Sequence, residues 1–174
     1  DHALEGPALY CGFYMNEVLL RLLHRHDAHS ALFEAYESAL GSLRHDTSNE
    51  PVLRIFEKHL LRELGYGLVL DQDIGDKTPI DADAMYDYVL DRGPVRLAHP
   101  ELNTPTEGVR VRGVSLLALA QESFSDPAAL RDAKALMRAA LSRHLGERPL
   151  HTRKLFRHVV PLNIMELEVD KVGR

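Results

Sequence analysis

An arginine beside a regular apolar pattern is the feature of this sequence best suited to chemistry. In the stretch 53–67, large apolar side chains recur at helical spacing on one face: Leu53, Phe56, Leu60 and Leu64, with Leu61 beside them. Arg54 falls on the first turn, close to this stripe. A cation next to an exposed apolar groove suits a peptide that ends in acidic and hydrophobic residues. The stretch therefore predicts a helix that can bind such a peptide.

A second candidate site is the excess of positive charge in the C-terminal third. Between residues 131 and 158 only Asp132 and Glu147 oppose the cations, which are Arg131, Lys134, Arg138, Arg143, Arg148, Arg153, Lys154 and Arg157. The first three are spaced three and four apart, so they share one helix face. Such clusters contact DNA phosphates in a salt-dependent way. We predict DNA contacts from all of them except Arg143. The alternative is a solvated face on two surface helices.

Three histidines at a junction between helices form a weaker candidate. His24, His26 and His29 follow the pattern H-x-H-x-x-H. Clustered imidazoles can bind zinc or copper. The spacing does not bring the three rings to one helix face, however, and no thiol or carboxylate stands as an obvious fourth ligand. An exposed polar turn is the favoured interpretation, and a small helical metal-binding protein or enzyme is the alternative.

Other motifs that would indicate enzyme chemistry, a metal or a cofactor are missing from the sequence. The aspartate-rich stretch 71–91 does not fit a calcium loop, because Gly75 falls at the fifth place from Asp71 and Ala82 at the twelfth. There is no glycine-rich phosphate loop, and Ser115 is not part of a G-x-S-x-G motif. We therefore predict a protein that is not an enzyme and holds no cofactor.

Helical patterns predict the elements that would position these residues. We expect helices at about 9–25, 28–43, 51–64, 114–119, 127–145 and 152–160. The core face of the first helix is expected to consist of Leu9, Phe13, Val18, Leu19, Leu22 and Leu23, and that of the second of Leu32, Phe33, Tyr36, Leu40 and Leu43. The stretch 68–111 alternates short apolar pieces with glycine and proline, which predicts a β-hairpin around 91–93. The predicted fold is mainly α, a single helical bundle over 1–174 with a small irregular β-hairpin excursion at 68–111 and a frayed end at 162–174.

Composition favours an ordinary globular protein in a reducing compartment. The chain of 174 residues is 45% hydrophobic, carries a net charge of −5 and is long enough to bury one core. No apolar run approaches the ~20 residues that span a bilayer, and no basic and apolar leader is visible. The single cysteine, Cys11, excludes an internal disulfide and is expected to be packed. These features predict a cytoplasmic protein without membrane contact.

Three segments together resemble a known family. Segment 53–67 reads LRIFEKHLLRELGYG, segment 14–20 reads YMNEVLL, and segment 144–156 reads HLGERPLHTRKLF. In order and spacing they are similar to the signatures LR-x-FE-x-x-LL-x-x-LGYG, Y-x-NELL and LG-x-(K/R)-PL-(K/x)-(S/T)-R-x-LF of the C-terminal helical domain of the bacterial RecO family. The resemblance covers roughly residues 10–160, and the family's N-terminal OB-fold domain is missing from this chain.

The resemblance implies a non-catalytic recombination mediator in DNA repair, cytoplasmic and associated with the nucleoid. Members bind single- and double-stranded DNA, associate with RecR, engage the acidic C-terminal tail of single-stranded DNA-binding protein, help to load RecA and promote strand annealing. On the matching helix, Arg54 would pair with the acidic end of the tail. Leu60, Leu61 and Leu64 would line or support the slot. Some relatives carry four zinc-binding cysteines in the excursion; this chain has none there, so we predict a zinc-free excursion held by packing and hairpin pairing.

Overall fold

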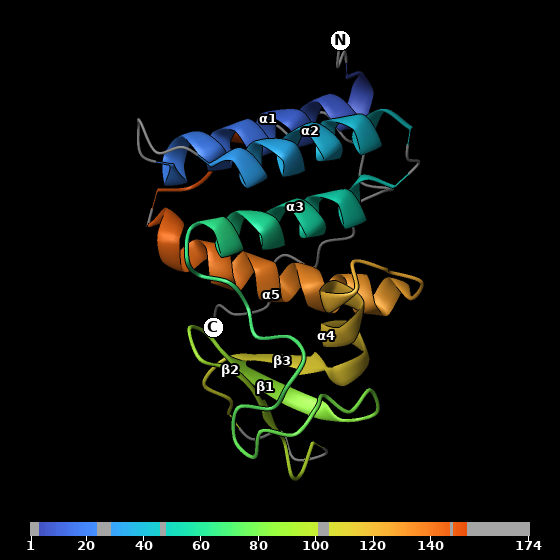
Figure 1. Ribbon diagram of the computed structural model, residues 1–174, viewed down its shortest axis with the longest axis vertical. Helices are drawn as coiled ribbons and strands as arrows, with labels where there is room; N and C mark the ends of the chain where they lie inside the picture. Colours follow the sequence, from blue (N-terminus) through green and yellow to red (C-terminus); the bar gives the residue numbers. More distant parts are fainter. Residues whose placement is uncertain (1–3, 24–28, 46–47, 101–104, 147, 153–174) are drawn as a thin grey trace, which may run out of the picture.

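The computed structural model describes residues 4–23, 29–45, 48–100, 105–146 and 148–152. Within them the elements in chain order are α1 (Gly6–Leu22), α2 (Ser30–His45), α3 (Asn49–Glu63), β1 (Met85–Val89), β2 (Gly93–Arg96), β3 (Val109–Arg112), α4 (Gly113–Ala120) and α5 (Pro127–Leu145). Helices α1 and α2 form one layer, α3 and α5 the next, and α4 leads to a small sheet at the far end (Figure 1). The prediction of a mainly α fold with a small β excursion is confirmed.

Helix α3 lies at the centre of the bundle, between α2 and α5. Phe56, Leu60 and Leu61 of its predicted apolar face are at most 1% exposed. The helix ends as predicted, because Gly65 adopts φ +83 and its amide donates to the Arg62 carbonyl at 3.0 Å. The Tyr66 amide donates to the Leu61 carbonyl at 2.8 Å, which completes a Schellman motif. This cap fixes where Tyr66 leaves the helix.

Helix α5 also begins and ends where its sequence predicts. The Asp126 carboxylate accepts a hydrogen bond from the Ala128 amide at 2.8 Å, and Pro127 occupies the first turn. Gly146 follows the last turn with φ +69. The inward face of α5 is buried and consists of Ala129, Ala133, Leu136, Met137, Ala140 and Leu141. The opposite side of α5 is therefore left to carry the basic residues.

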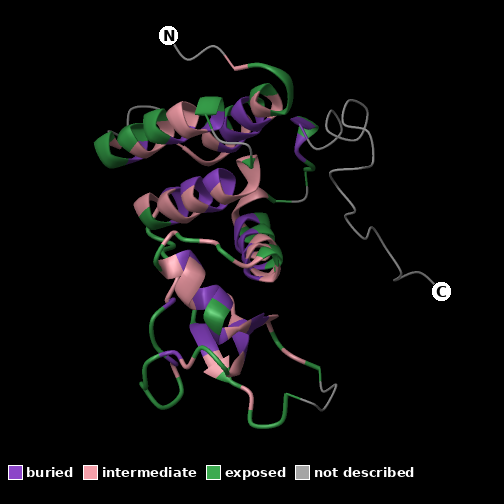
Figure 2. Cartoon of the chain, turned by 90° about the vertical axis from the view of Figure 1, so that its right-hand side faces the viewer, coloured by how far each residue is buried: buried purple, intermediate pink, exposed green. Residues whose placement is uncertain are grey.

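Three of the predicted core residues are in fact exposed. Leu9 is 38% exposed, Phe13 45% and Phe33 62%, and Leu20 of α1 reaches 83%. Their helices form the outermost layer of the bundle, and exposed residues mark its outward side (Figure 2). The side chains on the core face of α1 are Cys11, Tyr14, Met15 and Val18, of which Cys11 and Val18 are among the residues predicted to be packed. Helix α1 is apolar on both sides, so periodicity alone does not say which side is buried. In the described ranges, no helix has the length and apolar character needed to cross a bilayer.

The excursion contains one strand more than predicted. The hairpin of β1 and β2 turns at 90–92 as expected, with Asp91 at φ 66. Strand β3 then pairs with the other edge of β1, which gives an antiparallel sheet of order β2-β1-β3. Only four residues long and with an arginine at every second position, β3 carries too little apolar pattern to be recognised alone.

Two buried carboxylates help to hold the excursion together. Asp73, 3% exposed, accepts from the backbone amides of Gly75 at 2.5 Å and Arg96 at 2.7 Å. Asp87, in β1, accepts from the amides of residues 107 and 108 at 3.0 Å each. These bonds join loops to the sheet and satisfy buried charge. Beside them, Tyr86 and Tyr88 are at most 2% exposed, so the predicted packing and hairpin pairing are both present.

The segment after α5 is fastened to α1. The Glu17 carboxylate accepts from the amides of His151 at 2.7 Å and Thr152 at 2.8 Å, and from the Thr152 hydroxyl at 2.7 Å. Partial burial works to raise the pKa of Glu17, but these hydrogen bonds outweigh it and hold the pKa below its usual range. Arg21 donates to the carbonyls of Leu145 at 2.9 Å and Arg148 at 2.6 Å. The end of α5 is thereby fixed against α1.

Candidate functional site

Arg54 is buried between helices rather than placed at an exposed rim. Helix α3 begins earlier than predicted, at Asn49, so Arg54 extends from its second turn rather than its first, and the residue is 6% exposed. Its Nη2 donates to Glu57 Oε1 at 2.7 Å, and Glu57 is 1% exposed. The Tyr14 hydroxyl of α1 donates to the same oxygen at 2.5 Å. Arg54 Nε is buried and has no hydrogen-bond partner among the described residues.

The surroundings of this ion pair join three helices. Burial raises the pKa of the Cys11 thiol to about 11, with Glu50 raising it further and Arg54 acting against them. Glu50 also forms an ion pair with Lys134, so that α3 is linked to α5. Burying charges is expensive unless they are paired and hydrogen-bonded. The cluster is a candidate functional site, because the buried Arg54 Nε is left without a hydrogen-bond partner among the residues that the structure describes, and such groups are exceptional in folded proteins.

The three leucines predicted to form the peptide slot differ in exposure. Leu60 and Leu61 are completely buried, whereas Leu64 is half-buried near the end of α3. Leu60 and Leu61 can therefore support a slot from beneath, and Leu64 is the one of the three whose side chain a peptide can contact. Ten residues separate Arg54 from Leu64, which is about 15 Å along a helix. An extended peptide would need about five residues to reach both.

The predicted DNA-binding residues are only partly brought together. Arg131 and Arg138 are exposed on the outer side of α5, and Arg148 is exposed beyond its end. Lys134 lies between the first two but is 20% exposed and paired with Glu50. Arg153, Lys154 and Arg157 lie outside the described residues. The described part of this surface is thus a short line of cations on α5.

The histidine cluster lies mostly outside the described part of the chain. His24 and His26 lie outside the described residues, and only His29 is placed, just before α2. Among the described residues there is no group of three or more side chains arranged to hold a metal ion.

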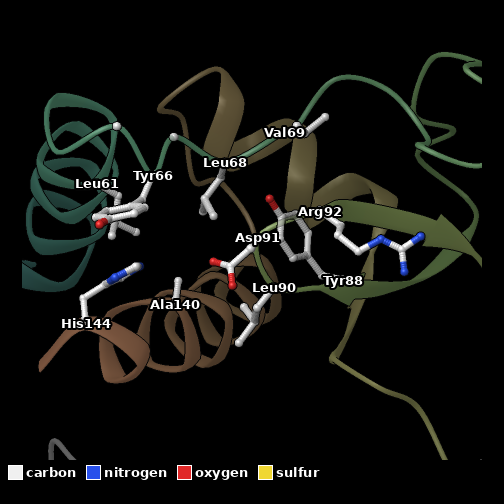
Figure 3. Close-up of a pocket in the computed structure, with 12 residues that line it drawn as sticks. Leu61, Tyr66, Leu68, Val69, Tyr88, Leu90, Asp91, Arg92, Ala140 and His144 are labelled. Carbon is white, nitrogen blue, oxygen red and sulfur yellow. The ribbon is translucent and has the colours of Figure 1, made fainter. Parts of the chain in front are cut away.

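A cavity of about 140 Å³ opens where α3, α5 and the excursion meet, and the sequence did not indicate it. The Tyr66 ring stacks on the His144 ring of α5, with ring centroids 3.9 Å apart and an angle of 23° between the planes. Figure 3 shows this pair at one end of the cavity and Asp91 with Tyr88 at the other. The Gly65–Gly67 cap signals where Tyr66 emerges, but its partner lies 78 residues further along the chain and could not be identified from spacing.

Comparisons with known proteins settle the family. The profile of the family described as "Recombination protein O C terminal" matches residues 4–154. The chain belongs to this family. It is 48% identical over 152 residues to a protein of Nitrosococcus oceani named "DNA repair protein RecO", covering 87% of this chain and 60% of that protein.

Further relatives with the same name match this chain over a similar length. The protein of Dechloromonas aromatica is 46% identical over 162 residues, which cover 91% of this chain and 65% of the relative. That of Coxiella burnetii is 47% identical over 154 residues, which cover 88% of this chain and 64% of the relative. The chain therefore spans about three fifths of the length of the curated relatives it matches.

Proposed function

We propose that this chain is the C-terminal helical part of a DNA repair and recombination mediator that acts by binding and not by catalysis. The observation that carries the proposal is membership of the RecO C-terminal family over residues 4–154. In this proposal the intact protein works in the bacterial cytoplasm at the nucleoid. With RecR it binds single- and double-stranded DNA, promotes strand annealing and helps to load RecA.

The contact proposed for this part of the protein is with the acidic C-terminal tail of single-stranded DNA-binding protein. Helix α3 offers the chemistry that such a tail needs: a guanidinium at Arg54, a half-buried apolar residue at Leu64, and rigid support from Leu60 and Leu61. The unpaired Nε of Arg54 supports the assignment, because a buried donor without a partner gains from a carboxylate. Since Arg54 is 6% exposed, binding requires its surroundings to open.

Replacing Arg54 and Glu57 together tests the tail site without leaving either charge buried and unpaired. We expect the double variant Arg54→Met/Glu57→Leu to fold, because apolar residues of similar volume can replace a buried ion pair. It should bind a labelled acidic tail peptide at least tenfold more weakly in fluorescence anisotropy, since a charge-assisted hydrogen bond contributes about 1.5–3 kcal/mol. Arg62→Ala, which removes a more exposed cation from the same helix, is the control. Equal affinity in the double variant and the parent would exclude Arg54 from the site.

The proposed DNA contact lies on the outer side of α5. Arg131 and Arg138 are exposed on the same side of the helix and are separated by about 10 Å along its axis. Two arginine side chains at this separation can reach two neighbouring phosphates of one DNA strand. Ser142 continues this exposed side toward the end of the helix. The contact is proposed to be electrostatic and independent of base sequence.

Neutralising the two exposed arginines should weaken DNA binding and change its response to salt. For Arg131→Gln/Arg138→Gln we expect the slope of log K against log salt for single-stranded DNA to become shallower by about 1.4, as two phosphate contacts are lost. Lys134→Gln is the matched control, because its charge is already paired with Glu50 and its loss should change the slope much less. A salt titration in which the double variant keeps the parent slope would remove α5 from the DNA-binding surface.

A further inference from the structure

We propose that the cavity at the end of α3 binds one unstacked cytosine base of single-stranded DNA. The inference rests on the proposed DNA binding and adds a subsite to it that differs from both the tail site and the cations of α5. Three features carry it: a stacked aromatic pair at the mouth, partly apolar walls with room for one ring, and a carboxylate directed into the space (Figure 3).

The aromatic pair offers a platform for stacking. Tyr66 is 50% exposed although its ring is already stacked on His144, so a large part of its surface is left open to a ligand. Bases of single-stranded nucleic acids bind proteins by stacking on such rings. The Schellman cap of α3 holds the Tyr66 backbone, and α5 holds His144, so the platform is formed before any ligand arrives. A preformed platform lowers the ordering cost of binding.

The walls limit the ligand to a single six-membered ring. Beyond the aromatic pair the cavity is lined partly by the apolar side chains of Leu61, Leu68, Leu90 and Ala140 and partly by polar groups, among them Asp91. Its volume of about 140 Å³ is close to that of cavities which accept benzene. A pyrimidine fits this volume, whereas a two-ring purine would have to extend into solvent.

The carboxylate of Asp91 distinguishes among the ligands of that size. It enters from the β1–β2 turn and faces the cavity between Leu68 and Leu90 (Figure 3). A carboxylate accepts a hydrogen bond from the exocyclic amine of cytosine, whereas thymine presents a carbonyl oxygen at the same position and offers no donor there. The carboxylates of an acidic peptide would be repelled by the like charge. Asp91 therefore favours cytosine over both.

An exposed cation at the rim, Arg92, can receive a flanking phosphate, whereas the neighbouring Arg143 is held by Asp91. Arg143 of α5 pairs with Asp91, with Nη2 and Oδ2 2.5 Å apart, and its side chain is 53% exposed. Arg92, the residue after Asp91 in the turn, is exposed and points outward from the cavity (Figure 3). The Arg143 pair also orients the Asp91 carboxylate. A base in the cavity would thus have positive charge on the side from which its backbone must approach.

Binding of short oligo(dC) and oligo(dT) to the whole chain, compared by fluorescence anisotropy at neutral pH, tests the inference. The parent should bind oligo(dC) about tenfold more tightly. Tyr66→Ala should weaken oligo(dC) binding about tenfold, whereas Tyr66→Phe, which keeps the ring, should retain it. Asp91→Asn should remove the preference for oligo(dC). Phe33→Ala, which removes an exposed aromatic ring from α2, is the control and should bind both as the parent does.

The outcomes separate the subsite from DNA binding itself. Equal, salt-sensitive binding of both oligonucleotides by the parent would overturn the cytosine site and leave the proposed DNA contact on α5 intact. A preference for oligo(dC) that survives Tyr66→Ala would also overturn it. Absence of binding to either oligonucleotide would contradict the DNA binding on which the inference rests.

Discussion

Replacing Glu57 with alanine is expected to lower the free energy of unfolding by about 3–5 kcal/mol, because it leaves the Arg54 guanidinium buried without its carboxylate. The Tyr14 hydroxyl loses its acceptor at the same time. Urea unfolding followed by circular dichroism measures the change. Glu34→Ala removes an exposed carboxylate from α2 and should alter stability by no more than about 0.5 kcal/mol.

The same reasoning applies to Arg54 itself. An exposed arginine in a first turn could be removed at little cost, but Arg54→Ala would strand Glu57 and is expected to destabilise the fold to a similar extent. The double variant Arg54→Met/Glu57→Leu should regain most of the lost stability. If Glu57→Ala changed the unfolding free energy by less than about 1 kcal/mol, the ion pair would not be buried as the structure has it.

Gly113→Ala is expected to give the other large loss of stability. A Cβ at this position would lie 1.8 Å from the Asp81 carbonyl oxygen, where β3 passes into α4. The Gly113 amide also donates to the Ala84 carbonyl at 2.8 Å, so the backbone cannot move aside without losing this bond. We expect a loss on the order of 3 kcal/mol, at the upper end of the range for overpacked sites.

A second glycine provides the matched control. Gly41 lies within α2, and a Cβ added there would meet no atom within 4 Å. Gly41→Ala should therefore stabilise the chain by up to about 1 kcal/mol through helix propensity. Thermal unfolding of both variants under the same conditions would show opposite shifts. A Gly113→Ala variant as stable as the parent would contradict the close approach of residues 81 and 113.

Local signals in the sequence were sufficient to predict most of the helical frame. The end of α3 depends on Gly65 and its two neighbours, and the start of α5 depends on Asp126 and Pro127, so each boundary is decided within one turn of chain. The apolar stripe of α3 was equally clear, because its residues are buried at a regular helical spacing. For the same reason the family could be inferred from three short segments.

Features that depend on distant parts of the chain were not predictable. The burial of Arg54 follows from the approach of α1, which brings Tyr14 to Glu57 across 43 residues. The exposure of Phe13 follows from the position of α1 in the outer layer. Strand β3 is recognisable only by its pairing with β1, and the cavity at Tyr66 exists only because α5 places His144 beside it. In each case the residues that meet lie far apart in the sequence, and no periodic pattern connects them.

The most direct test of the central claim is a titration of this chain with an acidic tail peptide that ends in an apolar residue and phenylalanine. Calorimetry with the intact peptide, with a peptide lacking the terminal phenylalanine and with one whose terminal carboxylate is amidated would compare the apolar and the ionic parts of the contact. We expect saturable binding of the intact peptide, weakened at least tenfold by either change. Equal heats with all three peptides, or no binding to any of them, would contradict the proposal that α3 recognises the acidic terminus of a partner protein.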